Sequence, residues 1–66
     1  MVNEKIRLHA KKMDIPLWKV ADKMGFSEAT LSRRLRHELP DSEANAYIIA
    51  IDELFQEKLD ETLDRV

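Results

Sequence analysis

Apolar residues recur at intervals of three and four along four stretches of the chain, which is the spacing of one face of an α-helix. Residues 14–16 and 38–40 each contain a proline and interrupt this pattern. We therefore expect an all-α fold with helices over residues 3–13, 16–24, 27–37 and about 41–64. The apolar positions are Ile6, Ala10 and Met13; Leu17, Val20, Ala21 and Met24; Leu31 and Leu35; and Ala44, Tyr47, Ile48, Ile51, Phe55, Leu59, Leu63 and Val66.

The predicted helix ends carry residues suited to those places. Asn3 is a candidate N-cap for the first helix, and Pro16 suits the first turn of the second. Gly25 can adopt the positive φ that ends a helix, and Ser27 can then cap the third helix. These signals support the boundaries that the apolar spacing predicts.

The second and third helices, joined by a tight turn, form a helix-turn-helix over residues 16–37. Ala21 is small enough for the two helices to cross closely, Gly25 supplies the turn and Phe26 fills the corner. With Leu31 and Leu35 facing inward, short polar and long cationic side chains remain on the surface of the third helix. They are Glu28, Ala29, Ser32, Arg33 and Arg36, with Arg34 beside them. Charged clusters are commonly solvated faces, but three arginines after a capped turn fit a DNA-facing helix better.

The predicted last helix is long and acidic, and it contains neither Gly nor Pro. The first three helices are too small to cover its apolar stripe beyond about Phe55. Leu59, Leu63 and Val66 then have no partner within one copy of the chain. We expect this stripe to pair two copies into a homodimer, and fraying of the last ten residues is the alternative.

Length and composition indicate one small domain spanning residues 1–66, and a chain of this length buries only about 60% of its unfolded surface. The absence of cysteine excludes disulfides and thiolate zinc sites and suits a reducing compartment. The longest apolar run, residues 47–51, is far shorter than the roughly 20 residues that cross a bilayer. The N-terminus has no signal-peptide pattern. We therefore expect a soluble, cytoplasmic chain without a membrane partner.

The net charge of −2 conceals a division between the two halves of the chain. Residues 1–37 contain nine Lys or Arg and four Asp or Glu, a net charge of +5. Residues 38–66 contain two Lys or Arg and nine Asp or Glu, a net charge of −7. This asymmetry predicts one half that faces nucleic acid and one half that faces away from it.

The residues that most often carry chemistry have simpler explanations here. His9 and His37 each lack the partners that a catalytic base or a metal site requires. With Gly25 as the only glycine, a Gly-rich phosphate loop cannot form. We therefore expect no enzyme, cofactor, metal or small-molecule ligand. Trp18 is expected to pack over the edge of the core, and contact with a phosphate or a protein is the alternative.

The sequence Val-Ala-Asp-Lys-Met-Gly at residues 20–25, followed by Phe26, Ser27 and a helix rich in Thr, Ser and Arg, resembles the phage Cro/lambda-repressor family of helix-turn-helix proteins. The resemblance covers about the first two-thirds of the chain. It implies that Ala21, Gly25 and Leu31 are structural positions.

The same resemblance implies which residues contact DNA. Base edges would be read by Glu28, Ala29, Ser32 and Arg33. Arg34 stands where the family has an apolar residue, so Arg33 and Arg34 are both candidates for the groove. Thr30 and Arg36 would contact nearby phosphates.

The expected function is sequence-specific binding of double-stranded DNA by a transcriptional repressor or regulator of phage or mobile-element type, with the third helix in the major groove. Arg33 or Arg34 would pair with guanine, and Glu28 would accept from cytosine. The candidate phosphate contacts are Lys12, Lys19, Lys23, Thr30 and Arg36. The alternative is a protein-interaction module or antitoxin-like adaptor, in which the acidic last helix binds a protein and the helix-turn-helix is a scaffold.

Overall fold

Four helices make up the computed structural model, which describes residues 3–64 and side chains as far as Glu61. They are α1 (Glu4–Lys12), α2 (Leu17–Met24), α3 (Glu28–Arg34) and α4 (Asp41–Asp64). No strand occurs between residues 3 and 64. The all-α prediction is confirmed. No helix in this range is both long enough and apolar enough to cross a membrane.

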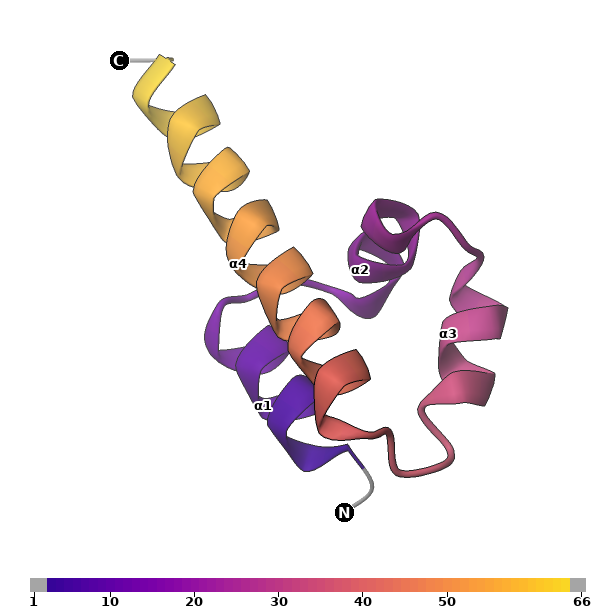
Figure 1. Cartoon of the computed structure of the whole chain (residues 1–66). Coiled ribbons are helices and arrows are strands. Elements are labelled where there is room, and N and C mark those ends of the chain that lie inside the picture. The colour runs from indigo at the N-terminus through magenta and orange to yellow at the C-terminus, as the bar shows by residue number, and fades with distance from the viewer. Residues whose placement is uncertain (1–2, 65–66) are drawn as a thin grey trace.

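The long helix α4 is the element on which the others assemble. It packs against both α1 and α2, and α3 packs against α2 (Figure 1). The C-terminal half of α4 extends beyond the other helices, on the side of the molecule away from α3 (Figure 1). The molecule is therefore elongated, with extents of 42 × 20 × 18 Å.

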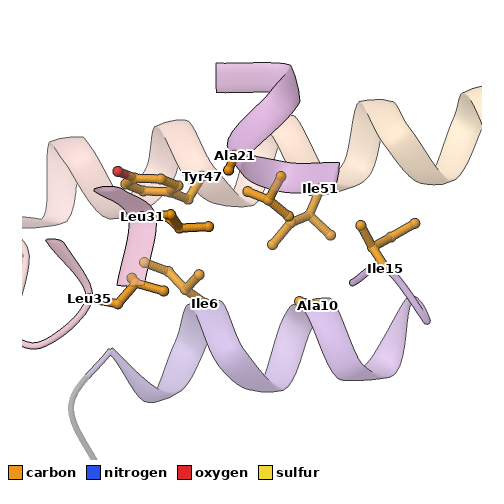
Figure 2. Close-up of a cluster of buried hydrophobic side chains, with 9 residues drawn as sticks. Ile6, Ala10, Ile15, Ala21, Leu31, Leu35, Tyr47 and Ile51 are labelled. Carbon is orange, nitrogen blue, oxygen red and sulfur yellow. The ribbon is translucent and has the colours of Figure 1, made fainter. Parts of the chain in front are cut away.

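The core consists of apolar side chains from all four helices and the α1–α2 connection. In Figure 2, side chains of α1 and α4 point toward one another, with Leu31 and Leu35 at one end and Ile15 at the other. A fully buried Leu, Ile or Val contributes about 1.5–3 kcal/mol, so this cluster is the main source of stability. Its buried members are Ile6, Ala10, Ile15, Val20, Ala21, Leu31, Leu35, Tyr47 and Ile51. All except Ile15 are among the predicted apolar positions.

The turn between α2 and α3 has the predicted geometry. Gly25 is in the left-handed region with φ 89°, and its N–H donates to the carbonyl of Asp22 at 3.1 Å. The Phe26 N–H donates to the Ala21 carbonyl at 3.0 Å, which satisfies a carbonyl at the end of α2. Ser27 caps α3, because its hydroxyl accepts from the Thr30 N–H at 3.2 Å. These local contacts turn the chain from α2 into α3.

Asn3 does not cap α1 with its side chain, which corrects the sequence-based prediction. It occupies the N-cap position with φ 55°, but its buried amide reaches across to the α3–α4 connection. The Nδ2 group donates to the carbonyls of Leu35 and His37 at 2.9 and 2.8 Å. The Oδ1 atom accepts from the Leu39 N–H at 2.9 Å. Every hydrogen bond of the Asn3 side-chain amide therefore joins it to the α3–α4 connection, which is far away in the sequence.

The α3 helix is shorter than predicted, since it ends at Arg34 rather than near His37. The carbonyls of Leu35 and His37 follow the helix and therefore need partners other than helical N–H groups. Here both carbonyls accept from Asn3 instead. Arg36 and His37 therefore lie in the connection to α4, outside the helix.

Two predictions about exposed apolar residues have different outcomes. Trp18 is 53% exposed and does not belong to the core, so its predicted packing is wrong. Leu59 is 42% exposed on α4, as the uncovered stripe predicts. The side chain of Leu63 and the whole of Val66, which complete the predicted stripe, lie outside the described residues.

We predict that Asn3→Asp destabilises the fold by about 2 kcal/mol or more, because a carboxylate would face two carbonyl oxygens and lose both donors. The free energy of unfolding in urea measures this loss. Asn45→Asp is the matched control, since Asn45 is exposed on α4 and the same chemical change there should stay within about 0.5 kcal/mol. Equal midpoints for the two variants would contradict the role of Asn3.

We also predict that Gly25→Ala costs about 1–2 kcal/mol, the penalty of a left-handed backbone for a residue with a Cβ. A Cβ on Gly25 would meet nothing within 4 Å, so the loss should come from the backbone alone. Gly25→Asn should therefore lose less, because Asn tolerates this region better. Thermal unfolding of both variants tests the prediction, and a Gly25→Ala protein as stable as the parent would refute it.

Candidate nucleic-acid interface

The exposed side of α3 is the candidate interface, and two buried leucines define its direction. Arg33 is two residues from both Leu31 and Leu35, and two residues correspond to a rotation of about 200° around a helix. Because both leucines are buried, Arg33 points to the opposite side. Glu28, Ala29 and Ser32 are also exposed on α3. Four of the five predicted base-reading residues thus share an open surface.

Arg34 has a different environment from Arg33. Its guanidinium lies 4.8 Å from the centre of the Phe26 ring and 3.7 Å from a carboxylate oxygen of Glu43 on α4. Phe26 in turn contacts the ring of Tyr47 edge-on, with ring centres 6.3 Å apart. Within residues 3–61, no hydrogen bond or ion pair engages the side chain of Arg33. The geometry thus leaves Arg33 available for a ligand and directs Arg34 toward the body of the protein.

The predicted phosphate-binding residues do not form one surface. Lys19 is exposed on α2, where its ammonium lies 5.8 Å from the centre of the Trp18 ring. Thr30 is half-buried in the first turn of α3, and Arg36 is exposed just after that helix. Lys12 is exposed at the end of α1, in an open groove between α1 and α4. Its assignment to a phosphate stays a prediction.

Lys23, the fifth of these residues, is engaged by α4. Its ammonium lies 3.3 Å from Glu57 and 3.5 Å from Glu53. The hydrogen bond to Glu57 is the main cause that raises the pKa of Lys23 above its ordinary value of 10.5. The ammonium is therefore charged at neutral pH, and only alkaline conditions would remove its contribution. Because this contact is exposed, a competing anion can reach it.

The acidic helix also engages other basic groups of the first half of the chain. Asp52 lies 2.7 Å from the His9 ring, and Glu43 and Glu57 lie near Arg34 and Lys23. The pairs with Arg34 and Lys23 thus compensate part of the net positive charge of residues 1–37 within the molecule. Counting charges along the sequence missed these pairs, because each joins residues that are far apart in the chain.

A second open groove, of about 630 Å³, lies between α2 and the C-terminal half of α4. Trp18 and Leu54 supply apolar surface there, and lysines and carboxylates of both helices surround them. The sequence analysis did not predict this groove. Residues 3–61, whose side chains the structure describes, contain no cluster of His, Cys, Asp or Glu that could hold a metal ion.

Comparisons of the chain with protein-family models, with curated proteins and with solved structures found no match. The function is therefore inferred from the chain's own residues and from its fold.

We predict that Arg34→Ala lowers the stability of the fold by about 0.5–1 kcal/mol, through loss of the contacts with Phe26 and Glu43. Arg33→Ala is the matched control in the neighbouring position, and it should unfold like the parent. Urea unfolding of the two variants measures the difference. A larger loss for Arg33→Ala would show that the two side chains have exchanged directions.

Proposed function

We propose that the chain binds double-stranded DNA in a sequence-specific manner, as a transcriptional repressor or regulator of phage or mobile-element type. The observation that carries this proposal is the orientation of α3. Two buried leucines attach the helix to the core, and the opposite side presents Ala29, Ser32 and Arg33 to solvent. An α-helix fits the major groove, and side chains of these kinds contact base edges there.

The exposed residues of α3 have distinct roles in this proposal. Arg33 donates two hydrogen bonds to a guanine, and Ser32 makes a shorter contact beside it. Glu28, in the first turn, accepts from the amino group of a cytosine, and Ala29 contacts a thymine methyl group. Arg34 fixes the orientation of α3 through Phe26 and Glu43 and does not read bases.

The flanking cations and hydroxyl hold the DNA backbone. Lys19 on α2, Thr30 in the first turn of α3 and Arg36 just after it contact phosphates that border the groove. Lys23 joins them when a phosphate replaces Glu57 as its partner, which the exposed position of this ion pair allows. Repression then follows from occupancy of the site, and the chain acts in the cytoplasm together with its DNA.

A protein-binding adaptor of antitoxin type is the second candidate. The groove that contains the half-exposed Trp18 favours it, since exposed aromatic residues are common where proteins bind one another. In this case the acidic half of α4 and the groove beside it engage the partner, and α2 and α3 serve as a scaffold.

Selection of bound sequences from a random DNA pool tests the first proposal. We predict that Arg33→Ala weakens binding to the selected site by about 1–3 kcal/mol and relaxes preference at one position. Lys19→Ala should weaken binding to all sequences alike and reduce the slope of affinity against salt by about one. Affinities are compared by titration at two salt concentrations.

Lys11→Ala is the control for the lysine substitution, because Lys11 is exposed on α1, outside the groove that Lys19 and Lys23 line. It should leave DNA affinity unchanged. Equal affinities of the parent for the selected site and for random DNA would exclude sequence-specific reading. Absence of binding at low salt would exclude DNA as the partner and favour the adaptor.

A further inference from the structure

The groove between α2 and the C-terminal half of α4 combines an exposed aromatic ring with several charged groups. Trp18 and Leu54 are its apolar residues, and Trp18 is half-exposed and lies outside the core. Trp18 and Asp22 on α2 are about one helical turn apart, as are Leu54 and Lys58 on α4. Each wall of the groove is therefore one face of a helix.

The three lysines that line this groove already have partners within the molecule. Lys23 pairs with Glu57, another lining residue, at 3.3 Å. Lys58 pairs with Asp14, which precedes α2, also at 3.3 Å. The ammonium of Lys19 lies over the neighbouring indole ring, 5.8 Å from its centre. Two of the three positive charges are therefore compensated by carboxylates.

Three carboxylates that line the same groove lack such compensation. In the part of the chain whose side chains are described, none of Asp22, Asp60 and Glu61 takes part in an ion pair, and all three are exposed. Asp60 accepts a hydrogen bond from the neutral amide of Gln56 at 3.2 Å, which leaves its charge in place. Apart from the ion pairs, three carboxylates and one ammonium remain in the groove. Its uncompensated charge is therefore negative, and charge complementarity favours a positively charged occupant.

We propose that this groove binds a short basic segment of another protein. A large apolar side chain of the segment packs on Trp18 and Leu54, and its lysine or arginine side chains pair with Asp60 and Glu61. Tryptophan is enriched among the residues that contribute most to protein interfaces. Residues 54–61 extend about 10 Å along α4, so a segment of about two helical turns fills the groove. This inference goes beyond DNA binding and does not depend on it, and for the adaptor it names the chemistry of the partner.

Selection from a random library of displayed peptides on the immobilised full chain tests the proposal. The enriched peptides should have a net positive charge and at least one large apolar residue. Because Trp18 is the only tryptophan of the chain, a selected peptide without tryptophan can be titrated in solution. Its binding should shift the fluorescence of Trp18 to shorter wavelength, since the ring leaves water. The affinity should fall as salt is added, because the charged contacts are exposed.

Substitutions in the groove test its two kinds of contact. Asp60→Asn combined with Glu61→Gln should raise the dissociation constant of a selected peptide about fivefold or more, because two charges are lost without a change in size. Glu4→Gln combined with Asp41→Asn is the matched control, since both carboxylates are exposed and neither lines the groove. Trp18→Ala, followed with a labelled peptide, should raise the dissociation constant about tenfold or more. Circular dichroism and urea unfolding confirm that the variants fold.

Three results would overturn the proposal. One is a selection that enriches no peptides, or peptides without net positive charge. Another is a peptide affinity that Trp18→Ala leaves unchanged, or that the two double variants lower equally. The third is a parent chain that self-associates in sedimentation velocity and that Trp18→Ala returns to monomers, because a second copy would then occupy the groove. Since the selection contains no DNA, its outcome is independent of whether α3 binds a duplex.

Discussion

The side-chain amide of Asn3 joins the start of α1 to the segment that connects α3 and α4, and the positions of all three helices depend on it. An amide is the one short side chain that offers two donors and an acceptor on the same group, as two carbonyls and one N–H require here. Asn also tolerates the left-handed backbone that aims this amide away from its own helix. These hydrogen bonds join residues that are more than thirty positions apart in the sequence. They therefore close the chain around the core.

This constraint also determines the surface offered by α3. The helix ends at Arg34, and the carbonyls of Leu35 and His37 that follow it accept from Asn3. Phe26 and Glu43 then hold Arg34 from two other parts of the fold, which leaves Arg33 pointing outward. The proposed recognition surface is therefore positioned by contacts on the side of α3 that faces the rest of the protein.

Features set by neighbouring residues were predictable from the sequence, and features set by distant residues were not. The apolar spacing predicted nearly all of the core, and Gly25 and Ser27 predicted the turn, because each depends on a few adjacent positions. The role of Asn3 and the choice between Arg33 and Arg34 depend on partners many residues away. Trp18 was misassigned because its exposure depends on how closely α2 and α4 approach. The DNA contacts themselves remain predictions.

Because Lys23 is paired with carboxylates of α4, the protein itself competes with external anions for this lysine. Any anion that approaches this lysine must displace Glu57, which lies 3.3 Å from the ammonium and is attached to the same molecule. A tethered carboxylate has a high effective concentration and is not diluted with the buffer. Binding at this position is then an exchange of one anionic partner for another. The acidic helix would therefore weaken non-specific binding of polyanions, whereas Arg33 would stay accessible to a specific ligand.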